Sequence, residues 1–264
     1  MKLAKYAALF KNGWQYNLEY RLNNLIQVLI SCVALISIFY LWNDVFRDRA
    51  AIAGYSREQI VTYYVIVGYL FASIFRGIQV AQQIRTGFVS IYLTKPISYL
   101  WYTYSLSLAD RLFRLVTGLP VLLGILIILR RHLYPVTDPW AYLWLFLAAF
   151  GAINILFLCD LIVGMMEFWF RDSDSLTTTT DSIIRFFAGT LIPVTLLPPA
   201  VQLVGRWLPF RYTGTFLIDT FMGRLPAAQI AYGLAVQTVW TALLFLAAAA
   251  IWRRGLKRYE AFGA

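Results

Sequence analysis

Long apolar runs are the feature that most restricts what this chain can fold into. The clearest cover residues 25–42, 60–81, 140–170 and 227–252, and a helix needs roughly 20 predominantly apolar residues to cross about 30 Å of hydrocarbon. Hydrophobic residues make up 60% of the sequence and charged residues only 14%, whereas soluble domains have about half and about a quarter. The composition predicts an all-α integral membrane protein and excludes a soluble enzyme or a disordered segment.

Two less regular runs bring the predicted number of transmembrane helices to six. Residues 115–129 are too few to span alone, but residues 101–109 are apolar enough to extend the same helix. Arg111 and Arg114 are expected to snorkel toward the headgroups. Residues 176–197 contain four threonines in a row, whose hydroxyls can bond back to helical carbonyls. This span is expected to be broken, or followed by a partial re-entry, at Gly189, Pro193, Pro198 and Pro199.

The residues before the first span have a helical apolar period, formed by Leu3, Tyr6, Ala7, Phe10, Trp14, Leu18 and Leu22. This pattern predicts an amphipathic helix in the inner membrane interface, with a frayed cytoplasmic tail as the alternative. Basic residues are more numerous on this side of the predicted spans, which predicts that both termini are cytoplasmic. Because no repeat or long linker divides the sequence, residues 1–264 are expected to form a single membrane domain.

The sequence offers little for catalysis or metal binding. Cys32 and Cys159 lie inside apolar runs and His132 is the single histidine, which leaves too few ligands for a metal site. Neither a G-x-S-x-G elbow nor a G-x-x-x-x-G-K-[ST] phosphate loop occurs. We therefore expect a chain that is not an enzyme and binds no cofactor. The net charge of +10 is attributed to cytoplasmic flanks and anionic lipid rather than to nucleic acid.

Ionisable residues inside the spans are the next candidates for function. Asp160 lies about twenty residues into the fourth predicted span, and Glu167 follows two turns later. They either form a proton or cation relay, or they are structural, with Asp160 bonding a neighbouring helix and Glu167 pairing with a basic residue at the inner surface. We favour the structural interpretation. Asp110 and Arg114, spaced i and i+4, are expected to form a local pair.

Three tyrosines in the second predicted span have two competing interpretations. Tyr63, Tyr64 and Tyr69 either face a conduit, where they would present aromatic surface to a substrate, or pack in the interior.

Between the second and third predicted spans, apolar residues from Phe88 to Leu93 predict a short helix of about two turns that ends before Pro96. This helix either docks on a partner or lies on the bilayer.

The same segment resembles a motif of ABC-2-type permeases, in which a glycine is followed by L-L-T-x-P-V-S; the matching residues are Gly87, Leu93, Thr94, Pro96, Ile97 and Ser98. A second match covers residues 187–193, 197–199 and 208–210, which resemble the S-G-x-x-I/F-P, L-P and L-P-F sequence that follows the fifth span in that family. The resemblance covers essentially the whole chain and is closest to the paired-permease branch of viologen or drug exporters. Two departures stand out: Gln82, Gln83 and Arg85 replace acidic residues, and Ala188 replaces a serine.

The resemblance implies a half-transporter that pairs with itself or with a paralogous permease and binds two cytosolic ABC ATPase subunits, which hold ATP and magnesium. It implies a coupling helix that contacts the ATPase through Gly87, Phe88, Ile91, Tyr92, Leu93, Thr94, Lys95 and Pro96. It also implies an external gate that contains Gly189, Pro193, Pro198, Pro199, Trp207 and Pro209; an ordinary outer loop is the alternative. The substrate path would be lined mainly by spans one, two and five.

The function implied in this way is ATP-driven export of an amphiphilic, drug-like, lipid or glycan substrate across a bacterial inner membrane. Two other classes stay open at this point. One is a secondary transporter that runs on an ion gradient through Asp160. The other is a membrane scaffold that transports nothing.

Overall fold

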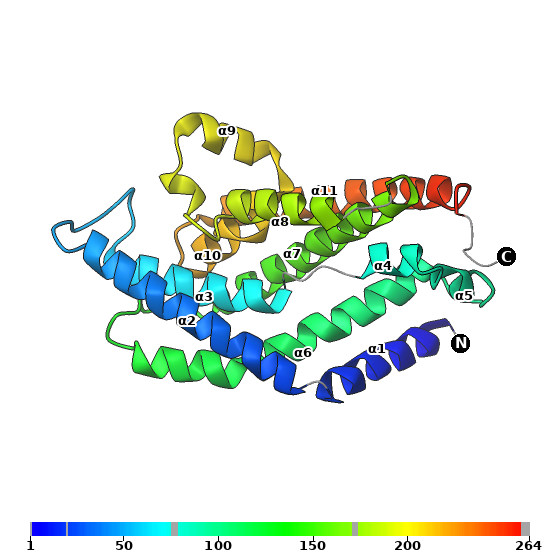
Figure 1. Cartoon of the computed structure of the whole chain (residues 1–264). Helices are drawn as coiled ribbons and strands as arrows, with labels where there is room; N and C mark the ends of the chain where they lie inside the picture. Colours follow the sequence, from blue (N-terminus) through cyan, green and yellow to red (C-terminus); the bar gives the residue numbers. More distant parts are fainter. Residues whose placement is uncertain (1, 20, 75–78, 171–173, 260–264) are drawn as a thin grey trace.

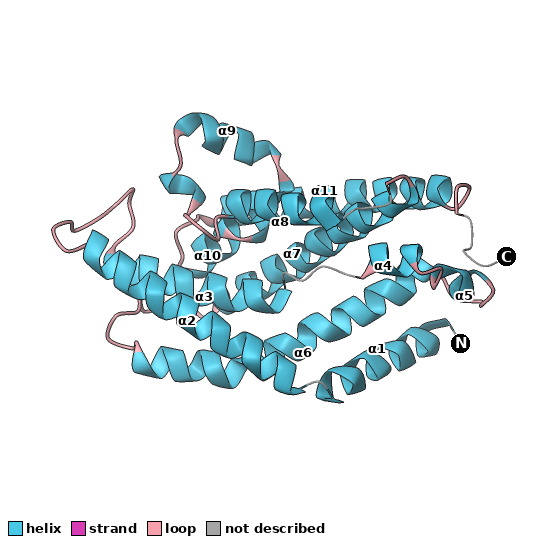
Figure 2. Ribbon diagram, in the orientation of Figure 1, coloured by secondary structure: helices cyan, strands magenta, loops and turns pink. Residues whose placement is uncertain are grey.

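The computed structural model describes residues 2–19, 21–74, 79–170 and 174–259. All regular secondary structure within these residues is helical, with no strand, which confirms the predicted all-α class. The long helices share roughly one axis, as Figures 1 and 2 show. The described part of the chain begins and ends at one end of this bundle, here called the terminal end. The opposite end, the distal end, carries α9 and the connections α2–α3 and α6–α7.

The α-helices in chain order are α1 (Lys2–Glu19), α2 (Arg21–Val45), α3 (Arg57–Ile74), α4 (Val80–Arg85), α5 (Val89–Leu93), α6 (Tyr99–Ile128), α7 (Trp140–Met165), α8 (Asp174–Ala188), α9 (Pro199–Trp207), α10 (Thr215–Phe221) and α11 (Ala227–Gly255). Three short 3-10 helices complete the order: η1 (Met166–Phe168), η2 (Val194–Leu196) and η3 (Pro209–Thr213).

Three helices of the described chain are long and apolar enough to cross a membrane: Tyr99–Ile128, Trp140–Phe168 and Ala227–Gly255. The first of these joins the two predicted runs 101–109 and 115–129 into one helix, as expected, with Pro120 tolerated inside it. Leu35–Val45 of α2 is a shorter apolar helix. The second predicted span, 60–81, includes residues 75–78, which lie outside the described residues. The total of six spans therefore stays a prediction.

The predicted break after the threonine-rich run is confirmed. α8 has 15 residues, which at 1.5 Å per residue gives a length of about 22 Å, less than the roughly 30 Å of a hydrocarbon core. It ends at Ala188, and Gly189 follows with φ +82°. Pro193 then precedes η2 and Pro198 precedes α9, so the chain turns repeatedly instead of continuing as one helix.

Helix α7 forms the centre of the bundle and packs against α11, α10, α4 and α8. Small residues allow close approach on the α11 side, where a Cβ added at Gly151 would meet the Gln237 side chain. The Gln237 amide donates to the carbonyls of Ala148, at 2.9 Å, and Tyr212, at 2.8 Å. These two bonds satisfy a buried amide and fix η3 and α11 on α7.

The predicted amphipathic helix at the amino terminus is present as α1, which packs along α6. The Trp14 ring lies edge-on to the Phe113 ring at 5.2 Å, and Gly13 lies directly against Ala109. The structure therefore shows that α1 contacts α6. The location of α1 in the membrane interface stays a prediction.

Candidate functional site

The predicted short helix at the terminal end is α5, and it ends before Pro96 as expected. Its five residues make it shorter than the two turns predicted. Val89 is buried, and the half-buried Tyr92 ring packs on the Tyr102 ring of α6 with 4.1 Å between centroids. The Lys95 ammonium lies 5.3 Å from the Tyr92 ring centroid. The contact between Tyr92 and Tyr102 fixes one side of α5 to α6.

The other side of α5 is apolar and exposed. Phe88 is 38% exposed, Ile91 45% and Leu93 49%. These side chains belong to a short segment between helices, not to one of the three helices that qualify as spans. A cluster of exposed apolar side chains outside the spans is typical of a contact surface for another protein or for lipid.

Local hydrogen bonds hold the turns on both sides of α5. Gly87 has φ +75°, a conformation that glycine adopts without strain, and its carbonyl accepts a 2.7 Å bond from Ser90 Oγ. At the other end, Thr94 Oγ1 donates to the Ile91 carbonyl at 3.0 Å. The motif residues Gly87 and Thr94 therefore shape the backbone of this segment.

An ion pair anchors the segment to η1, which directly continues α7. Arg85, at the end of α4, donates from Nε to Glu167 Oε1 at 2.8 Å and from Nη2 to Oε2 at 3.3 Å. This confirms that Glu167 pairs with a basic residue. Tyr99 Oη also donates to Gln83 Oε1 at 2.6 Å. Two of the residues that depart from the permease motif, Gln83 and Arg85, thus tie α4 to neighbouring helices.

Asp160 is paired inside the bundle, as the structural interpretation expected. Its Oδ2 accepts a 3.0 Å bond from Arg111 Nη2, and the two side chains are only 7% and 2% exposed. Arg111 also donates from Nε to the carbonyl of Ile74 at 2.7 Å and from Nη1 to Ser107 Oγ. The expectation that Arg111 snorkels is therefore wrong, because Asp160 and the end of α3 supply partners in the interior.

Two further expectations concern the pair of Asp110 and Arg114 and the three tyrosines of α3. Asp110 and Arg114 form the predicted local pair, with 3.1 Å between Oδ2 and Nε. The hydroxyls of Tyr63, Tyr64 and Tyr69 donate to the backbone carbonyls of Gly189, Leu191 and Leu115, in that order. Tyr63 and Tyr64 are buried. These contacts support the interpretation that the tyrosines pack.

The segment that resembles an external gate begins at a tightly packed glycine. A Cβ on Gly189 would lie 2.1 Å from Thr215 Oγ1 and 2.7 Å from Tyr63 Oη. Thr215 Oγ1 in turn contacts the Ala188 carbonyl at 3.1 Å. α3, α8 and α10 therefore meet at this turn, and only glycine fits there.

Beyond this turn, α9 presents apolar side chains outward. Pro193 and Pro209 are buried, whereas Pro198, Pro199 and Trp207 are exposed. Gln202 Nε2 donates to the carbonyls of Thr195 and Leu197 at 3.1 and 2.8 Å, which closes the loop that leads into α9. Figure 1 shows α9 standing away from the bundle at the distal end.

Sequence reasoning missed a polar cluster at the distal end, here called the distal clasp: Tyr55, Asp219 and Arg224. Tyr55 Oη donates to Asp219 Oδ1 at 2.7 Å, and Arg224 Nε lies 3.2 Å from the same oxygen. The Arg224 guanidinium stacks 3.7 Å from the Tyr55 ring centroid. Burial raises the pKa of Asp219 and of Tyr55 above their usual values. Tyr55 and Asp219 are 164 residues apart, and no local pattern links them.

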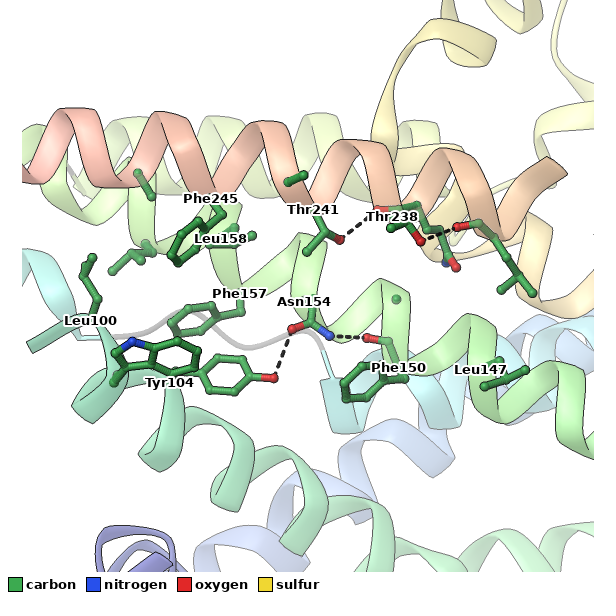
Figure 3. A pocket seen from close by; sticks show the side chains of 17 residues that line it. Leu100, Tyr104, Leu147, Phe150, Asn154, Phe157, Leu158, Thr238, Thr241 and Phe245 are labelled. Carbon is green, nitrogen blue, oxygen red and sulfur yellow. Dashed lines mark hydrogen bonds between the residues drawn. The ribbon is translucent and has the colours of Figure 1, made fainter. Parts of the chain in front are cut away.

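A lateral groove of about 660 Å³ lies between α6, α7 and α11 and was also missed. Figure 3 shows Tyr104, Phe157 and Phe245 on its walls. Its few polar groups are bonded within the protein: Tyr104 Oη donates to Asn154 Oδ1 at 3.0 Å, and Asn154 Nδ2 donates to the Phe150 carbonyl. The groove is built from helices other than those that the resemblance assigns to the substrate path.

The long apolar helices, the ion pairs inside the bundle and the exposed α5 define a class: a helical integral membrane protein with a contact surface at its terminal end. The model of a family described as ABC-2 family transporter protein matches residues 32–263. The chain belongs to this family, so it is the membrane permease of an ABC transporter and the partner of an ABC ATPase. No curated protein matches it. The predicted branch of viologen or drug exporters stays a prediction.

Proposed function

We propose that this permease exports its substrate, that α5 is the coupling helix, and that two cytosolic ATPase subunits drive each complex. The observation that carries the proposal is the exposed apolar side of α5, formed by Phe88, Ile91 and Leu93. A groove on an ATPase would remove this surface from water, which is favourable by about 25 cal/mol per Å². The other side of α5 packs on α6. A displacement of α5 by the ATPase would therefore be transmitted to α6.

The proposed path of coupling follows the contacts of α4 and α5. Arg85 joins α4 to Glu167 at the end of α7, and a Cβ on Gly164 of α7 would touch Val80 of α4. Deeper in the bundle, Arg111 joins α6, α7 and the last carbonyl of α3. Movement of α5 would thus be carried through these contacts to three packed helices.

The remaining parts of the proposal follow from family membership and the predicted orientation. The permease pairs with a second permease, identical or paralogous, in a bacterial inner membrane, with both termini in the cytoplasm. ATP and magnesium bind to the ATPase partners. The segment from Gly189 to Pro209, including Trp207, lies on the outer side and gates the exit of an amphiphilic, drug-like, lipid or glycan substrate.

The test is affinity purification of the tagged chain from native membranes, followed by identification of co-purifying chains that carry a Walker A loop. Leu93→Asp is expected to reduce recovery of that ATPase about tenfold or more, since it places a charge where the ATPase would bury the exposed leucine. Membrane insertion should be unchanged. Leu203→Asp, a matched substitution of an exposed leucine on α9, is the control and should recover the ATPase normally. Equal recovery with both variants would contradict the proposal.

A further inference from the structure

A second cavity, of about 410 Å³, lies at the distal end between α2, α3 and α6. Its walls are apolar and come from residues 35–42 of α2, 61–65 of α3 and 125–129 of α6. The stretch 35–42 rises about 10 Å along its helix, compared with roughly 15 Å for half of a hydrocarbon core. The cavity therefore has the depth to take a large part of one acyl chain.

Three polar residues adjoin lining residues at the distal end of this cavity. Asn43 directly follows the lining residue Trp42, Arg57 lies one helical turn before Val61, and the His132 ring stands edge-on to the lining Phe39 at 5.6 Å. Asn43 Oδ1, Arg57 Nε and His132 Nδ1 are buried and have no hydrogen-bond partner among the residues that the structure describes. Buried polar atoms are nearly always bonded, so three such atoms around one cavity indicate a ligand with complementary groups.

The charge around the mouth is net positive. Arg130 and Arg131, both exposed, directly follow the lining residue Leu129. The Glu58 carboxylate interacts electrostatically with Arg57 and His132 and accepts a 2.9 Å bond from Ser56 Oγ. Glu58 thus faces Arg57 and His132. Beside the lining residues, Arg57, Arg130 and Arg131 outnumber the acidic Asp44 and Glu58.

The loop that carries the histidine is fixed in place. Tyr134 N donates to Thr62 Oγ1 at 2.8 Å, and His132 N donates to the Leu129 carbonyl at 2.7 Å. The first bond joins the α6–α7 connection to the beginning of α3. The second forms a turn directly after the end of α6. These bonds keep His132 beside the lining residue Phe39 at the distal end.

We propose that this site binds one anionic phospholipid, with an acyl chain in the cavity and the headgroup at the rim formed by Asn43, Arg57 and His132. A phosphodiester accepts from Arg57 Nε, and the surrounding arginines favour a net negative headgroup. Asn43 Oδ1 is an acceptor and requires a donor, such as the hydroxyl of a glycerol headgroup. Phosphatidylglycerol supplies both groups. A soluble anion would leave the apolar cavity unused, whereas a lipid uses both parts.

The site is independent of α5 and of the ATPase contact, since it lies at the opposite end of the bundle. Under the proposed orientation it opens to the outer leaflet. The bound lipid is part of the permease structure.

The experiment titrates the detergent-purified, delipidated full chain with dioleoyl phosphatidylglycerol and with dioleoyl phosphatidylcholine, measured by native mass spectrometry. Phosphatidylglycerol should bind about tenfold more tightly, and Arg57→Gln should lose about that factor because a charge-assisted hydrogen bond is removed. Arg47→Gln, which removes an exposed charge in the neighbouring loop, should bind as the native chain does. Glycerol phosphate alone should not displace the lipid.

A second pair of variants tests the cavity itself. Ile125→Trp fills the lining and should weaken lipid binding about tenfold, whereas Ile127→Trp, on the same helix but 68% exposed and outside the lining, should not. Equal affinity for the two lipids, equal effects within either pair of variants, or displacement by glycerol phosphate would overturn the proposal. If Ile125→Trp instead shifts the monomer–dimer balance without changing lipid affinity, a second copy fills the cavity and the proposal also fails. ATPase recovery should be normal in all four variants, so this result is separable from the function of α5.

Discussion

Two ion pairs occupy different environments in this molecule. In the bundle interior, Arg111 and Asp160 are 2% and 7% exposed. At the terminal end, Glu167 is 3% exposed but its partner Arg85 is 44% exposed. Both pairs join α7 to another helix, and both have short contacts, of 3.0 and 2.8 Å. The exposure of the arginine, not the distance, distinguishes the two pairs.

The difference assigns the two pairs different roles. A buried charge that loses its partner cannot be solvated, so the interior pair holds α3, α6 and α7 in one arrangement. At the terminal end only the carboxylate is buried, and the Arg85 guanidinium stays hydrated while it moves. The terminal pair is therefore suited to a joint that moves when α5 is pushed, whereas the interior pair is suited to a fixed pivot.

The largest expected effect comes from breaking the interior pair. Arg111→Met leaves Asp160 buried without its charged partner and should destabilise the chain by roughly 3–5 kcal/mol. Thermal unfolding in detergent measures this. The double variant Arg111→Met, Asp160→Leu removes both charges and should recover most of the loss, since replacing a whole buried pair by apolar groups is often nearly neutral.

The same double variant separates structure from transport. If Asp160 were a proton or cation relay, the double variant would be stable but inactive. If the pair is structural, the stable double variant transports its substrate with most of the native activity. A single Arg111→Met variant as stable as the native chain would contradict the role of the interior pair as a pivot.

A smaller effect is expected at the terminal end. Arg85→Gln should reduce stability by roughly 1–3 kcal/mol, less than Arg111→Met, because Glu167 is buried but the glutamine amide can still donate to it. It should nevertheless raise the amide exchange rate of α4 and α5 several-fold, since these short helices lose an anchor to α7. Arg254→Gln, an exposed basic residue at the same end, is the control. Equal exchange rates in the two variants would show that the ion pair does not hold α4.

Sequence reasoning performed best where the determinants are local. Pro96 and the apolar residues before it were sufficient to predict α5, and the prolines after Gly189 were sufficient to predict the broken span. The i, i+4 pair of Asp110 and Arg114 follows from helical spacing alone. In each case the residues that decide the structure lie within a few turns of one another.

It failed where the partners are distant in sequence. Arg111 was placed at the headgroups by its position relative to apolar runs, but Asp160, 49 residues later, holds it in the interior. The distal clasp joins residues from the α2–α3 connection and α10, and the proposed lipid-binding rim combines the end of α2, the start of α3 and the α6–α7 connection. Such sites depend on which helices pack together, and hydropathy and spacing in one sequence do not specify that packing.

The smallest expected effect concerns the distal clasp, which is intermediate between the two ion pairs because Asp219 is 8% exposed and Arg224 21%. Burial raises the pKa of Asp219 more than the Tyr55 hydrogen bond and the Arg224 charge lower it. Its contribution to stability is therefore fully present below the unfolded pKa, about 3.9, and is lost as the pH rises through the folded value.

Asp219→Asn removes this titration and should gain stability relative to the native chain as the pH rises from 4 to 7, by less than about 1 kcal/mol. Unfolding temperatures of both proteins across this range measure the difference. Asp138→Asn, an exposed acidic residue in the other distal connection, should show no such trend. The prediction would be contradicted by a stability difference that is constant with pH, or by one that favours the native chain at high pH. Either result would mean that Arg224 and Tyr55 fully compensate the effect of burial on Asp219.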